Sequence, residues 1–193
     1  MHEALFKYIK THSSTPLTES EMEMIKHTFI PKKLRKRQFF LQEGDVCKYG
    51  GFIVKGAMRQ YSVDDKGVEH IVHLYIENYW ASDRESAIML TPSKYYIEAW
   101  EDTELLIITR TEMLGLMQKI PSITQITRLM DERSFIASQR RLNSTISNTA
   151  EKRYKEFADT YPQFIQRFPQ HFIASFLGIT KETLSRIRNQ TLK

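Results

Sequence analysis

The chain has 193 residues, of which 41% are hydrophobic, and it carries 28 lysines and arginines against 23 aspartates and glutamates. This composition is that of a globular protein with one large domain or two small ones, and it excludes a disordered or fibrous chain. The lone cysteine, Cys47, excludes an intrachain disulfide and an iron–sulfur site. Apolar runs are far shorter than the ~18 residues that span a bilayer, and the first residues lack a signal-peptide core. We therefore expect a soluble, cytoplasmic protein.

Positive charge is concentrated at the C-terminal end. Residues 1–138 carry 18 basic and 19 acidic side chains, whereas residues 139–193 carry 10 basic and 4 acidic ones. A basic segment beside a nearly neutral one is typical of a polyanion-binding module joined to a second module, because contacts to phosphates drive nucleic-acid affinity. The charge distribution fits a solvated basic surface equally well.

The first strong local signal in the chain is the start of a helix. Thr18 and Glu21 form a capping box. Met22, Ile25 and Phe29 follow at spacings that place them on one helical face. This pattern predicts a helix that buries one side.

Glycines and β-branched residues dominate the next part of the chain. Five of the seven glycines lie between Gly44 and Gly67, and the Asp-Asp-Lys-Gly sequence at 64–67 predicts a hairpin turn. Strands are expected at residues 50–56, 57–63, 68–76, 95–100 and 105–109. Short strands separated by glycine turns indicate an antiparallel roll or barrel.

From Thr111 to the end the apolar spacing is helical. It predicts a short helix that stops before Pro121, a long helix over residues 122–146, and a third that starts at Asn148 and ends before Pro162. The long helix has the spacing of a helix that pairs lengthwise with a partner, at Ile123, Ile126, Met130 and Ala137. An amphipathic helix lying on its own domain is the alternative.

The last 24 residues contain the most specific pattern in the chain. Two short helices that cross steeply need a small residue at their contact and a residue that tolerates left-handed geometry at the turn, and Ala174 and Gly178 supply these. Thr180 is placed to cap the second helix. Apolar residues that would bury the pair are Ile173, Leu177, Ile179, Leu184 and Ile187. The pattern predicts a helix-turn-helix.

The second of these helices, residues 181–190, has two different faces. At about 100° per residue, Leu184 and Ile187 lie on one side. The opposite side carries Lys181, Glu182, Ser185 and Arg186. Such a face suits the DNA major groove, where Lys or Arg donates to guanine and Glu accepts from cytosine. A helical hairpin with a solvated face is the alternative.

These features, ending in Gly-Ile-Thr-Lys-Glu-Thr-Leu-Ser-Arg at 178–186, resemble the Crp–Fnr family of bacterial transcription regulators over almost the whole chain. The resemblance implies an α+β fold. Residues 1–120 would form an antiparallel, jelly-roll-like β-roll sensor domain of the cyclic-nucleotide-binding type, residues 121–146 a dimerisation helix, and residues 147–193 a winged helix-turn-helix. It also implies a homodimer bound to a palindromic operator in double-stranded DNA.

The resemblance also assigns roles to individual residues. The family motif Arg-Glu-Thr-x-x-Arg matches Lys-Glu-Thr-Leu-Ser-Arg here, which implies that Glu182 and Arg186 read bases. Lys181 stands where the family often has arginine, and a lysine cannot donate the two parallel hydrogen bonds of a guanidinium group. Gln170 and Thr180, at the two helix starts, would face phosphates. The remaining expected DNA-binding residues are Thr183, Ser185 and Arg188.

The sensor half departs from the family pattern. Cyclic-nucleotide binders of this family place Gly-Glu on the ribose and Arg-Ser on the phosphate, whereas the corresponding stretches here read Trp80-Ala81-Ser82-Asp83 and Ser93-Lys94. We expect that cyclic AMP is not the effector, whose identity stays unknown. No cofactor, metal site or catalytic residue is expected.

Two other functions remain open. One is a ligand-binding regulatory protein that acts through protein partners. The other, less favoured, is a cupin-type enzyme, which would need clustered metal ligands. No local pattern discloses a surface for RNA polymerase or an effector.

Overall fold

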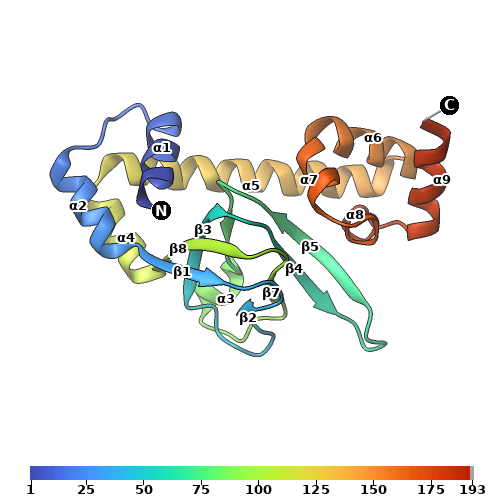
Figure 1. Cartoon of the computed structure of the whole chain (residues 1–193), viewed down its shortest axis with the longest axis horizontal. Helices are drawn as coiled ribbons and strands as arrows, with labels where there is room; N and C mark the ends of the chain where they lie inside the picture. The colour runs from blue at the N-terminus through green and yellow to red at the C-terminus, as the bar shows by residue number, and fades with distance from the viewer. Residues whose placement is uncertain (192–193) are drawn as a thin grey trace. The chain divides into compact units, whose positions relative to one another are not determined.

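A computed structural model describes residues 1–191 (Figure 1). The chain forms two compact units, each discontinuous in sequence. The first unit is Met1–Gln60 with Tyr75–Glu132, and the second is Tyr61–Leu74 with the chain from Arg133 onward. A segment from the strand-rich part of the sequence therefore belongs to the same compact unit as the C-terminal helices.

The boundaries expected from the sequence, 1–120, 121–146 and 147–193, divide the chain by function and stay a prediction. The compact units divide it differently, because residues 61–74 leave the first unit. Residues 192 and 193 of the expected third part lie outside the described residues.

The strands of residues 1–191 form two four-stranded sheets, as expected for an antiparallel roll. One sheet has the order β1 (Ile30–Leu34), β8 (Thr103–Thr109), β3 (Tyr49–Lys55) and β6 (Trp80–Ala81). The other has the order β2 (Phe39–Leu41), β7 (Tyr96–Ala99), β4 (Met58–Val63) and β5 (Glu69–Tyr75). The five predicted strands are confirmed as β3, β4, β5, β7 and β8. The sequence analysis missed β1, β2 and β6.

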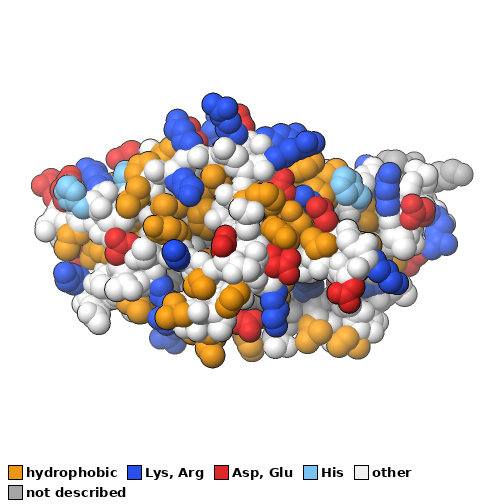
Figure 2. All heavy atoms as spheres, turned by 90° about the horizontal axis from the view of Figure 1, so that it is seen from below, with side chains coloured by type: hydrophobic (Ala, Val, Ile, Leu, Met, Phe, Trp, Pro, Cys, Tyr) orange, Lys and Arg blue, Asp and Glu red, His pale blue; other side chains and the backbone are white. Residues whose placement is uncertain are grey.

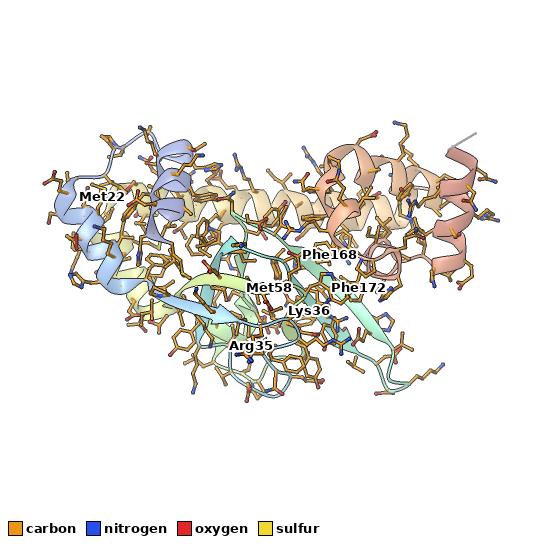
Figure 3. All side chains as sticks on the ribbon, in the orientation of Figure 1. Met22, Arg35, Lys36, Met58, Phe168 and Phe172 are labelled. Atoms are coloured by element: carbon orange, nitrogen blue, oxygen red, sulfur yellow. The ribbon has the colours of Figure 1, made fainter. Side chains whose placement is uncertain are left out.

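The pairing of β3 with β8 builds two hydrophobic cores at once. Phe52 lies opposite Leu106 and Ile53 opposite Leu105, and all four side chains are buried. Successive side chains of a strand point to opposite faces. Phe52 and Leu106 therefore pack with the helices before and after the roll, whereas Ile53 and Leu105 fill the roll interior with Met58 (Figure 3).

Four helices described in the first unit accompany the roll: α1 (His2–His12), α2 (Glu19–Thr28), α3 (Arg84–Met89) and α4 (Arg110–Lys119). The predicted capping box at the start of α2 is confirmed, with Thr18 and Glu21 each accepting from the other's backbone N–H. Ile25 and Phe29 are fully buried, and Met22 is partly buried (Figure 3). The sequence analysis did not predict α1.

The described C-terminal part is entirely helical: α5 (Pro121–Ser147), α6 (Ala150–Thr160), α7 (Pro162–Arg167), α8 (Gln170–Leu177) and α9 (Lys181–Thr191). The start expected at Asn148 is wrong, because the hydroxyl of Thr149 accepts from the Lys152 N–H and caps α6. Residues 147–191 contain no strand, which corrects the expectation of a wing within them. Their core is aromatic, with Phe168 and Phe172 both buried (Figure 3).

The long helix is buried only in its first half, and there it packs on its own unit, as the alternative of an amphipathic helix lying on its own domain predicts. Lengthwise pairing with a partner stays a prediction. Ile123 and Ile126 are buried in the first unit's core, Met130 is half-buried, and Ala137 is exposed. Further along, α5 exposes other apolar side chains instead: Phe135, Ile136, Leu142 and Ile146. None of the helices within residues 1–191 is long and apolar enough to cross a membrane.

The turn between β3 and β4 gives a stability prediction. Gly56 has a φ of +102°, and a Cβ there would lie 2.6 Å from the Asp102 carbonyl oxygen and 2.8 Å from the Thr103 Cα. We expect Gly56→Ala to lower the free energy of unfolding by about 3 kcal/mol or more, measured by urea denaturation, because it adds a backbone clash to the φ strain. Gly67→Ala is the control, since Gly67 has a φ of +79° with open space around it, and about 1 kcal/mol is expected. Equal losses in the two variants would contradict the clash.

Candidate nucleic-acid interface

The turn between α8 and α9 is built by Gly178 in the left-handed conformation, at φ 65° and ψ 38°. The N–H of Ile179 donates to the Ala174 carbonyl at 3.0 Å, which closes the end of α8. The hydroxyl of Thr180 accepts from the Thr183 N–H at 3.1 Å and caps α9. The predicted roles of Gly178 and Thr180 in the helix-turn-helix are confirmed.

Burial of one face of α9 determines which side chains face outward. Leu184 is fully buried and Ile187 is 3% exposed, and Ile173, Ala174 and Leu177 of the neighbouring α8 are also buried. Because α9 makes its contacts to α6 and α8 on this side, the opposite side faces solvent.

The outward face of α9 brings together four of the eight residues proposed to bind DNA. Exposed side chains line a shallow depression of about 610 Å³, and they are Lys181, Glu182, Ser185, Arg186, Asn189 and Gln190. The sequence analysis missed the last two, although each lies one turn beyond a residue of the predicted face. In Figure 2 the end of the molecule beside the grey atoms shows mainly charged side chains.

The other proposed DNA-binding residues are not all part of this face. Thr183 is half-buried, and its hydroxyl receives a hydrogen bond from Thr180 at 3.1 Å. Arg188 is also half-buried, toward the edge of the face. Gln170 is exposed at the first residue of α8. It is therefore separated from the α9 face by the length of α8.

Helix α6 contributes an acidic neighbour to the face. A carboxylate oxygen of Glu151 lies 4.0 Å from a guanidinium nitrogen of Arg186, and both side chains are more than half exposed. Hydrogen bonds from its own backbone N–H and from Thr149, with a smaller effect of Arg186, hold the pKa of Glu151 below its usual value. Such an exposed pair restrains Arg186 only weakly.

In the β-roll, the residues that the resemblance places at the nucleotide contacts are hydrogen-bonded to one another. The hydroxyl of Ser93 donates to the Asp83 carboxylate at 2.7 Å, and the Ser86 N–H donates to its other oxygen at 3.3 Å. All three residues are buried. Burial, with Cys47 and Asp83 adding to it, raises the pKa of the nearby Tyr75 hydroxyl. An acidic group at this place repels a phosphate anion.

A second buried polar contact in the roll is the ion pair between Arg59 and Glu98. Two guanidinium nitrogens donate to one carboxylate oxygen at 2.7 and 3.0 Å, and both side chains are buried. The charge of Arg59 is therefore balanced within the protein. Among the described residues no group of three or more His, Cys, Asp or Glu side chains is arranged to hold a metal ion.

Comparison with protein-family models matches residues 31–120 to the cyclic nucleotide-binding domain. Comparison with curated proteins finds no match. Solved structures with a similar fold include FixK2 from Bradyrhizobium japonicum, with 18% sequence identity, 84% of each chain covered and a TM-score of 0.69.

Two further solved structures resemble most of this chain. The catabolite activator protein of Thermus thermophilus shows 20% identity over 90% of this chain and 83% of its own, with a TM-score of 0.54. A putative Crp/Fnr-family transcriptional regulator from Eubacterium rectale shows 16% identity with the same coverages and a TM-score of 0.64. At these identities the likeness is one of fold.

Proposed function

Residues 31–120 form a domain of the cyclic nucleotide-binding type and the chain has the fold of Crp–Fnr regulators, and on this premise we propose that the protein is a sequence-specific DNA-binding transcription regulator. The observation that carries the proposal is the two-faced α9. Its apolar face is buried by Leu184 and Ile187, while Lys181, Glu182 and Arg186 are exposed on the other side. Proteins of this fold act as regulators and are not enzymes, and we extend that to this chain.

The exposed face of α9 offers the groups that the major groove requires. Arg186 supplies a bidentate donor for guanine, and Glu182 an acceptor for the cytosine amino group. A carboxylate on a surface that met only phosphates would be repelled, so Glu182 favours base reading. Lys181 and Ser185 add donors beside them. Gln170 and Thr180 face phosphates from the starts of the two helices.

The protein acts as a homodimer on a palindromic operator. The exposed apolar stripe of α5 supports this, because a long helix that leaves Phe135, Leu142 and Ile146 in water gains by pairing with a second copy. Two-fold symmetry then matches two half-sites about 34 Å apart.

The effector, if one exists, is not cyclic AMP. The buried Asp83 carboxylate, bonded to Ser93 where the family places its phosphate-binding arginine, supports this. A protein that acts only through protein partners would have no need to expose both Glu182 and Arg186 on the second helix of a helix-turn-helix. A cupin-type enzyme needs clustered metal ligands, which the described residues lack.

The first test selects bound duplexes from random DNA and then compares variants on the selected site. Arg186→Ala should cost about 1–3 kcal/mol at one base position and relax the preference there, while affinity for unrelated DNA changes little. Arg110→Ala, which removes an equal charge from an exposed position on α4, is the control and should leave the preference intact. An equal loss of affinity for every duplex would refute base reading by Arg186.

The second test concerns the dimer. Leu142→Glu should weaken self-association at least tenfold in sedimentation velocity, because it places a charge in an apolar seam. Asn143→Glu adds the same charge at the neighbouring exposed position and should leave the dimer intact. If both variants remain as dimeric as the wild type, α5 is not the dimer contact.

The third test concerns the effector. Cyclic AMP and cyclic GMP at millimolar concentration should leave the Tm unchanged, since a ligand that does not bind the folded state cannot stabilise it. The selected duplex serves as a positive control that should raise the Tm. A saturable rise with either nucleotide would show that the sensor roll binds it after all.

A further inference from the structure

Strand β5 is the last strand of its sheet, so one side of its backbone has no neighbouring strand among residues 1–191. The outward N–H and C=O groups of such an edge need other partners. In this protein two side chains from the helical part supply them. Both belong to the same compact unit as the β4–β5 hairpin.

The first partner is Ser175 on α8, the first helix of the helix-turn-helix. Its hydroxyl oxygen accepts from the Ile71 N–H at 2.9 Å and donates to the Glu69 carbonyl at 3.3 Å. A single hydroxyl thus satisfies a donor and an acceptor of the same strand edge. The contact depends on backbone groups of β5, and it fixes the hairpin to α8 directly.

The second partner is Arg141 on α5. Its guanidinium donates to the Val72 carbonyl at 2.5 Å and to the Ile71 carbonyl at 3.4 Å. The same group lies over the Phe176 ring of α8, 4.2 Å from the ring centre. Burial, with Arg141 adding to it, lowers the pKa of His73 to about 4, so no second positive charge competes there at neutral pH.

This contact leaves the outward face of α9 open. The side chains that hold β5 come from α5 and α8, whereas Lys181, Glu182 and Arg186 stay exposed. The hairpin therefore fixes the helix-turn-helix without covering it. In Figure 1 the two strands run as a continuous hairpin, and β4 begins in the roll at Met58.

We propose that Arg141 and Ser175 are positioning residues for the DNA reader: they fasten β5 to α8, so that the hairpin determines the orientation in which α9 meets DNA. The proposal rests on the proposed DNA-binding function. The two α9 helices of the proposed dimer must enter two major grooves that are a fixed distance apart. A fixed orientation of α9 therefore favours operators with one spacing between the half-sites.

The test measures the Kd of the full-length protein for the selected operator and for versions with one or two base pairs inserted between the half-sites. Ser175→Ala and Arg141→Lys should each lower affinity for the selected operator about tenfold and reduce the preference for its spacing. The lysine keeps the charge but lacks the planar fork. The base preference at the position read by Arg186 should stay unchanged.

Matched controls separate positioning from general damage. Ser147→Ala removes a hydroxyl that donates to the Asn143 carbonyl within α5, and Arg140→Ala removes the charge next to Arg141; both should behave as the wild type. Ser175→Thr keeps the hydroxyl and should therefore keep the operator affinity of the wild type, unlike Ser175→Ala. Amide hydrogen exchange at Ile71 should speed up in Ser175→Ala and remain slow in the controls.

The outcomes are distinguishable. If Ile71 exchanges faster but operator affinity and spacing preference stay at wild-type values, the positioning role is refuted while the regulator function stands. The positioning role is also refuted if operator affinity falls only in proportion to the fraction of unfolded protein. A wild-type chain that selects no DNA sequence refutes the proposed function, and this proposal with it, before any variant is made.

Discussion

The left-handed turn at Gly178 is the constraint on which the candidate reader depends. It lets α8 and α9 cross closely enough for Leu184 and Ile187 to be buried against Ala174. Once these apolar side chains face inward, helical geometry forces the polar residues of α9 outward. The exposure of the charged face is thus a consequence of packing, and no separate interaction is needed to hold it open.

The sensor roll satisfies its own buried polar groups. The Asp83 carboxylate is bonded by Ser93 and Ser86, and the charge of Arg59 is balanced by Glu98. Buried charges are tolerated when they are paired or hydrogen-bonded. A roll of this kind does not need a bound anion to neutralise its interior, which is consistent with the proposal that cyclic AMP is not the effector.

The outer edge of β5 is completed by side chains from the helices of its own compact unit. An unpaired edge is costly, and here a serine of α8 and an arginine of α5 complete it. The same hydrogen bonds that protect the strand also make residues 61–74 part of the helical unit. Under the proposed positioning role, the contacts that protect the sheet edge also orient α9.

The sequence by itself determined the strongly periodic and strongly capped elements: the capping box at Thr18, the strands around the glycine turns, and the helix-turn-helix with its polar face, because local spacing and cap chemistry encode them. It did not reveal β1, β2 or the start of α6, where short or edge elements carry little periodic signal. The apolar stripe of α5 and the contacts of Arg141 and Ser175 with β5 were decided only by tertiary structure. These contacts join residues about 70 to 106 positions apart through backbone groups, and backbone groups leave no mark in a sequence pattern.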